Sequence, residues 1–85
     1  MAEGGILRLV NVMRLHKNNV QILEVGVGAL QAIGQDIPTH YDIMRDSGAV
    51  DVIEAAVRHS EATKPTKIAG VDLLSHLVIG YEIVH

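Results

Sequence analysis

Cysteine, phenylalanine and tryptophan are absent from the 85-residue sequence, and only two tyrosines and two prolines are present. Without cysteine there can be no disulfide framework, no thiolate zinc site and no cysteine nucleophile. Hydrophobic residues make up 48% of the chain and aromatic residues only 2%, so a core must be built from Val, Ile, Leu, Ala and Met. Such an aliphatic composition favours closely packed helices.

Basic residues are also few, with seven Lys and Arg against ten Asp and Glu and a net charge of -3. This balance lacks the basic surface that binding to a phosphate backbone requires, so we expect no nucleic-acid partner. Polar residues such as Asn11, Gln31 and Asp72 interrupt the apolar stretches before they reach the roughly 18 residues of a membrane span, and residues 1–5 carry no basic signal segment. We therefore expect no membrane association, and a soluble intracellular protein of the cytoplasm or the nucleus.

Apolar residues recur at steps of three and four along most of the chain, which is the spacing of one helix face. This pattern predicts five helices, over residues 6–15, 19–33, 40–46, 49–59 and 64–78. In the last of them the apolar side is expected to hold Ile68, Val71, Leu74 and Val78. No segment keeps the two-residue alternation of a half-buried strand for long, so the predicted fold class is all-α.

Residue types at the breaks predict where these helices begin and end. Asn18 with Gln21 is expected to cap the second helix, and Gly34 to follow its last turn. Thr39 and Thr63 are expected to cap the third short helix and the last helix, which accepts Pro65 in its first turn.

The second half of the chain repeats the first. Gly5 aligns with Gly48, 43 positions later, and Gly26 aligns with Gly70, 44 positions later, with the apolar face reproduced between them. A period in the low forties predicts stacked helical units. We expect one domain, residues 1–85, with a partial first repeat at 1–36, a second repeat at 37–80 and the truncated start of a further element at 81–85.

The repeat resembles the armadillo family in particular segments. The stretch from Ile43 to Val50 is similar to the short first helix, glycine turn and second-helix opening of an armadillo repeat. The Val20-Gln21 pair, followed by Gly-Ala-Leu-Gln-Ala-Ile at 28–33, is similar to the long third helix of that family. HEAT repeats share the period and the helix-pair logic and are the second choice. The resemblance implies a solenoid, or α-α superhelix, of which this chain supplies about five helices in two stacked units.

The resemblance also implies a function, because third helices of armadillo repeats line a concave groove that binds proteins. It implies a non-enzymatic protein–protein interaction scaffold whose binding residues here are Glu24, Gly28, Gln31, Ala32, Gln35, Asp72, Ser75 and His76. Peptide-clamping members hold an Asn in the third helix where this sequence has Ala32 and His76, and their groove tryptophan is missing, which argues against capture of an extended basic peptide. The carboxylates of Glu24 and Asp72 still favour a mildly basic protein partner.

An enzymatic or ligand-binding function is the alternative that the residues leave open. Asp72 and His76 lie one helical turn apart and could form a dyad, so a small all-helical enzyme or ligand-binding domain with a pocket near them is the second hypothesis. No two of the five histidines are spaced three or four apart, and Gly26-Val27-Gly28 lacks the third glycine of a nucleotide motif. We expect no catalytic residue, no metal and no cofactor. We expect Gly26, Gly28 and Gly70 to permit close helix approach instead.

A two-unit piece of a solenoid has two open ends. Because about three repeats are normally needed for stability, apolar surface at those ends is expected to contact flanking repeats or a second copy. The residues expected there are Ile6, Leu7, Val10 and the segment 77–83.

Overall fold

The structure, a computed structural model, describes residues 2–78 and, of these, the side chains from Gly4 onward. The described residues form helices and no strand, as the apolar spacing predicts. Five α-helices follow one another along the chain: α1 (Ala2–Leu15), α2 (Val20–Asp36), α3 (His40–Ser47), α4 (Ala49–Arg58) and α5 (Lys64–Leu77). The segment 79–85, including the element expected at 81–85, lies outside the described residues.

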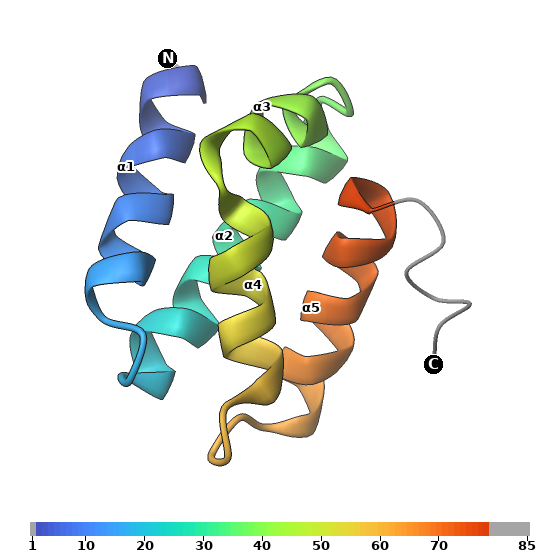
Figure 1. Ribbon diagram of the computed structural model, residues 1–85. Helices are drawn as coiled ribbons and strands as arrows, with labels where there is room; N and C mark the ends of the chain where they lie inside the picture. The colour runs from blue at the N-terminus through green and yellow to red at the C-terminus, as the bar shows by residue number, and fades with distance from the viewer. Residues whose placement is uncertain (1, 79–85) are drawn as a thin grey trace.

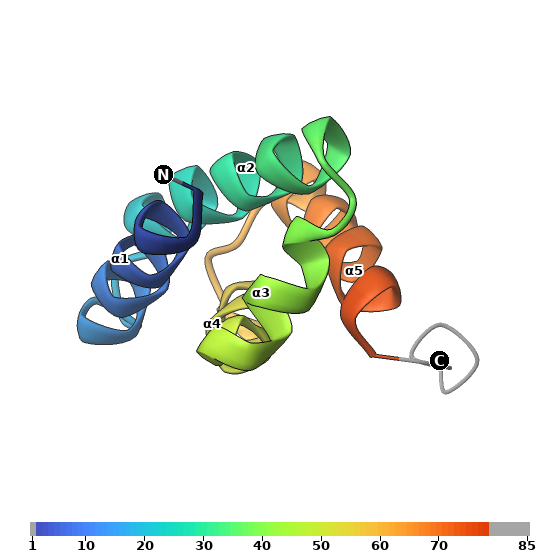
Figure 2. The same ribbon diagram turned by 90° about the horizontal axis from the view of Figure 1, so that it is seen from above.

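Two helical hairpins and one crossing helix make up the molecule (Figure 1). Helices α1 and α2 form the first hairpin and α4 and α5 the second, while the short α3 joins them at the top. Helices α2 and α5 pack together and run in the same direction, and α1 contacts both α3 and α4. Seen from above, α2 lies across one side of the molecule, with α1 and α5 at its two ends and α3 and α4 facing it (Figure 2).

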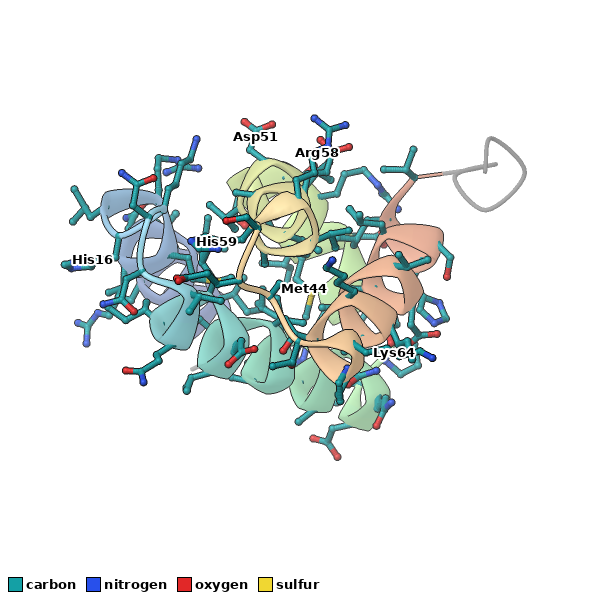
Figure 3. The ribbon with its side chains drawn as sticks, turned by 90° about the horizontal axis from the view of Figure 1, so that it is seen from below. His16, Met44, Asp51, Arg58, His59 and Lys64 are labelled. Atoms are coloured by element: carbon teal, nitrogen blue, oxygen red, sulfur yellow. The ribbon has the colours of Figure 1, made fainter. Side chains whose placement is uncertain are left out.

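The core between the helices is wholly aliphatic, as the composition predicts. Met44 of α3 lies in the middle of the molecule, between the two hairpins (Figure 3). All five helices contribute to this single cluster, whose buried members are Ile6, Val10, Met13, Leu23, Val27, Leu30, Met44, Ala49, Val52, Ile53, Ala56, Leu73, Leu74 and Leu77. Burial of such side chains supplies the main favourable free energy of folding, about 1.5–3 kcal/mol for each large one.

Two predicted helix boundaries are wrong. The side chain of Asn19, not Asn18, caps α2, because its Oδ1 accepts a hydrogen bond from the Ile22 N–H at 3.2 Å. Gly34 does not end α2, which continues to Asp36; Gly34 is buried inside the helix, where the ring of Tyr41 leaves no room for a side chain. The chain therefore needs glycine there for close packing and not for a left-handed turn.

The remaining helix ends agree better with the sequence. Gly48 adopts a left-handed conformation with φ 88, which favours glycine and lets α4 start directly after α3. Pro65 lies in the first turn of α5, as expected. Thr39 and Thr63 precede α3 and α5, but neither side chain makes a capping hydrogen bond.

The glycines expected to permit close helix approach do so at two of three positions. A Cβ on Gly26 would overlap the side chain of Met13, and one on Gly70 would overlap Val57, so each glycine lies against the other helix of its own hairpin. Gly28 is exposed with open space around it, so that part of the prediction is wrong.

The predicted apolar ends are also wrong in their main members. Ile6, Val10 and Leu77 are buried, because α1 turns that face toward α3 and α4, and α5 packs its last turn against α3. Leu7 is exposed. In α5 the buried residues include Leu73 and Leu74, whereas Ile68, predicted on the apolar side, is 61% exposed.

Within residues 2–78 every helix is too short or too polar to cross a membrane.

Candidate functional site

A row of polar side chains connects α2 to α5 on the surface of the molecule. The Nε2 of Gln31 donates a hydrogen bond of 3.2 Å to Oδ2 of Asp72. The other carboxylate oxygen, Oδ1, lies 3.9 Å from Nε2 of His76, one turn further along α5. The side chains of Asp72 and His76 remain about half exposed, so the row is open to solvent while its members hold one another in place.

Tyr41 of α3 completes this row, and the sequence reasoning missed it. Its ring stacks on the His76 ring, with centroids 4.5 Å apart and planes 10° apart, and its edge lies over Gly34 of α2. Burial, and secondly the negative charge of Asp72, raise the pKa of Tyr41. The rarity of aromatic residues, 2% of the chain, was the one feature of the sequence that could have drawn attention to Tyr41 as a site residue. We call Gln31, Tyr41, Asp72 and His76 the α2–α5 surface.

A second polar contact between the same helices lies nearer the start of α5. Oε2 of Glu24 accepts hydrogen bonds from the Thr66 hydroxyl at 2.9 Å, the Thr63 hydroxyl at 3.0 Å and the Thr63 N–H at 3.3 Å. These bonds, that from Thr66 first, lower the pKa of Glu24 because they favour the carboxylate. Thr63 thus uses its hydroxyl to join α5 to α2 in place of capping α5.

The other predicted binding residues do not join these contacts. Gly28, Ala32 and Gln35 are exposed on α2. Ser75 donates its hydroxyl hydrogen bond to the backbone carbonyl of Asp72 at 2.6 Å, within α5 itself. The structure therefore brings together three of the eight predicted residues, Gln31, Asp72 and His76, and places Glu24 in a separate contact.

The described residues bring together few groups that could support catalysis or bind a metal. Ser75 is bonded to a backbone carbonyl and not to His76. Nowhere in residues 2–78 do three His, Asp or Glu side chains come close enough together to hold a metal ion. Two surface hollows lie elsewhere: one of about 330 Å³ between α1 and α2, and one of about 530 Å³ beside Arg45, Val50, Leu77 and Val78. Neither is lined by Asp72 or His76.

A histidine links the two loops at the opposite end of the molecule from α3. His59 follows α4, and Figure 3 shows it turned inward, whereas His16 points outward. The ring Nδ1 of His59 accepts a hydrogen bond from the Glu61 N–H at 3.0 Å, and its Nε2 lies 3.3 Å from the Asn18 carbonyl oxygen. Because a backbone N–H can only donate and a carbonyl can only accept, this geometry requires the neutral ring with its proton on Nε2.

Fold and surface together define the class of this protein as a small all-helical domain with a polar inter-helix surface. Comparison with protein-family models, with curated proteins and with solved structures finds no match to the chain.

Proposed function

We propose that this chain is a non-enzymatic protein-binding module made of two armadillo-type helical units, and that the α2–α5 surface contacts the partner. The observation that carries the proposal is the row of contacting side chains from three helices, Gln31, Tyr41, Asp72 and His76, in which Asp72 and His76 are exposed.

The architecture supports the first half of the proposal. Both hairpins place a glycine, Gly26 or Gly70, against the partner helix of the same hairpin, at positions 44 residues apart in the sequence. The third helix of each proposed unit, α2 or α5, lies beside the other and runs in the same direction (Figure 1). A left-handed glycine, Gly48, joins the short α3 to α4 as the resemblance implies.

The surface chemistry supports the second half. A side chain that is already held by its neighbours loses less conformational entropy when a partner binds, so a bonded row favours recognition over an array of free side chains. Tyrosine is enriched among the residues that dominate binding energy, and the carboxylate of Asp72 favours a partner with basic groups. The Asp72–His76 pair alone would also suit an enzyme, but the two hollows described above lie away from it, which favours the scaffold.

The test is affinity capture with matched pairs of substitutions. The double variant Asp72→Ala, His76→Ala removes an exposed carboxylate and base spaced four apart on α5. The control, Glu54→Ala, Arg58→Ala, removes another such pair from α4, where the two side chains are 3.8 Å apart and away from the α2–α5 surface. Arg58 points outward from α4 (Figure 3).

We expect the wild-type chain and the α4 control to retain the same partner and the α5 variant to lose it. Circular dichroism must give the same helix content for all three proteins. A partner retained equally by both double variants would contradict the proposal, as would a small-molecule turnover that the α5 variant abolishes.

A further inference from the structure

An apolar groove runs between α1 and α2, the two helices of the first hairpin. Its volume is about 330 Å³. Its lining, which is almost wholly apolar, consists of Leu9, Val12, Gln21, Ile22, Val25 and Gly26. Val25 is 72% exposed and Val12 45% exposed, so this surface is open among the described residues. We call it the α1–α2 groove.

Two of the corresponding positions in the second hairpin are buried or in contact with the first hairpin. Leu9 corresponds to Val52, 43 positions later, and Val52 is fully buried. Ile22 corresponds to Thr66, 44 positions later, and Thr66 bonds to Glu24 of the first hairpin. At Thr66, therefore, the side of α5 that matches the groove contacts the first hairpin.

The residue of the first hairpin that contacts the second hairpin also has a counterpart in α5. Glu24 of α2 makes the contact to Thr66, and its counterpart 44 positions later is Ile68 of α5. Ile68 is 61% exposed, although isoleucine favours burial. The second hairpin thus carries an exposed apolar side chain at the position from which the first hairpin contacts its neighbour.

The Glu24–Thr66 contact between the two hairpins has an equivalent pair of positions on their outer surfaces, with different side chains. Inside the chain the pair is polar, with the Glu24 carboxylate accepting from the Thr66 hydroxyl at 2.9 Å. On the outer faces of the two hairpins the equivalent pair is Ile68 and Ile22, and both members are apolar. Both members of the second pair are apolar where both members of the first pair are polar. This match points to a second copy of this chain as the partner of each outer face.

We propose that the α1–α2 groove binds the Ile68 side of α5 from a second copy, so that copies stack head to tail. The proposal rests on the two-unit repeat of the proposed function. Such an interface joins two different surfaces, so every added copy still offers one free groove and one free Ile68. Each step removes from water the apolar surface of Val12 and Val25 in one copy and of Ile68 in the other, all of which are exposed in the isolated chain.

The experiment uses one charged substitution at each end. Val12→Asp lies in the groove on α1, and Ile68→Asp lies on α5. Ile37→Asp is the control, because Ile37 is 45% exposed like Val12 but lies between α2 and α3 and not in the groove. Sedimentation equilibrium over a roughly hundredfold range of concentration measures self-association of each protein and of mixtures.

We expect wild type and Ile37→Asp to associate, and each end variant alone to associate at least about tenfold more weakly, since each loses burial of an apolar side chain. An equimolar mixture of Val12→Asp and Ile68→Asp should form a dimer that grows no further, because each variant keeps one intact end. Helix content measured by circular dichroism should be the same in all variants.

A wild-type chain that stays monomeric over the whole range would overturn the proposal. So would an Ile68→Asp protein that dimerises as tightly as wild type, which would indicate a groove-to-groove contact, or a mixture that associates no more tightly than either variant alone. Capture of another protein by the α2–α5 surface is an independent measurement, because Val12 lies on α1 and contributes nothing to that surface. A wild-type chain that self-associates but captures no other protein would contradict the proposed function alone.

Discussion

Replacement of Gly34 by alanine should destabilise the protein, although alanine is the better helix former. In an open helix position this change would stabilise by about 1 kcal/mol. At Gly34 the new Cβ would overlap the Tyr41 ring, a rigid group already stacked on His76 at 4.5 Å. Overpacking of this kind costs about 1–3 kcal/mol, and loss of an aromatic pair adds about 0.5–1.5 kcal/mol. We expect a net loss of about 1–3 kcal/mol in the free energy of unfolding.

The same helix supplies the control. Gly28 has open space around it, so Gly28→Ala should raise the free energy of unfolding by about 0.5–1 kcal/mol. Urea titration followed by circular dichroism measures both changes, and each 1 kcal/mol should move the melting temperature by about 4–8 °C in a domain of this size. The proton NMR shifts of the His76 ring should change in Gly34→Ala only, because Tyr41 must move.

The reasoning fails if Gly34→Ala is as stable as Gly28→Ala. It also fails if Gly34→Ala is destabilised while the His76 resonances stay in place, since the strain would then lie somewhere other than the Tyr41 stack.

Three further predictions concern titration and tautomers. The pKa of Glu24 is lowered, first by the Thr66 hydroxyl, so the contribution of Glu24 to stability is present above the ordinary glutamate value of 4.5 and is lost as pH falls through the lower folded value. Thr66→Val should raise this pKa in a carboxyl NMR titration, and an unchanged pKa would contradict the assigned cause. The pKa of Tyr41 is raised by burial and then by the charge of Asp72, so the associated stability is present below the ordinary tyrosine value of 10.0 and is lost as pH rises through the higher folded value. Asp72→Asn should lower this pKa in an ultraviolet titration, and an unchanged pKa would contradict the contribution of that charge. The ring of His59 should carry its proton on Nε2, which nitrogen NMR of the folded protein reads directly; a proton on Nδ1 would be incompatible with the backbone N–H that this atom accepts.

Much of the fold could be predicted because its signals are local. The apolar spacing of three and four gave the helices to within a few residues, and the break at Ser47-Gly48 was found because only glycine readily adopts the positive φ required there. Glu54 and Arg58 form an ion pair at 3.8 Å that their spacing in the sequence indicates, since residues four apart on a helix are neighbours wherever that helix lies.

The candidate site could be predicted only in part. Gln31, Asp72 and His76 were expected because of the armadillo resemblance, but Tyr41 was not, because its contact with His76 depends on how α3 crosses the end of α5. Gly34 was predicted to end α2 for the same reason. The sequence alone does not distinguish a glycine that makes room for a ring from another helix from a glycine that ends a helix.

The sequence by itself determined that the chain is helical, where the helices break and that the core is aliphatic, because backbone conformation and side-chain periodicity are set within a few residues. The tertiary structure alone decided that Gln31 meets Asp72, 41 positions away, and that Ile6 and Val10 are buried while Val25 and Ile68 are exposed. Those outcomes depend on which helix faces pack together, and the free energy of that packing is shared among residues far apart in the chain.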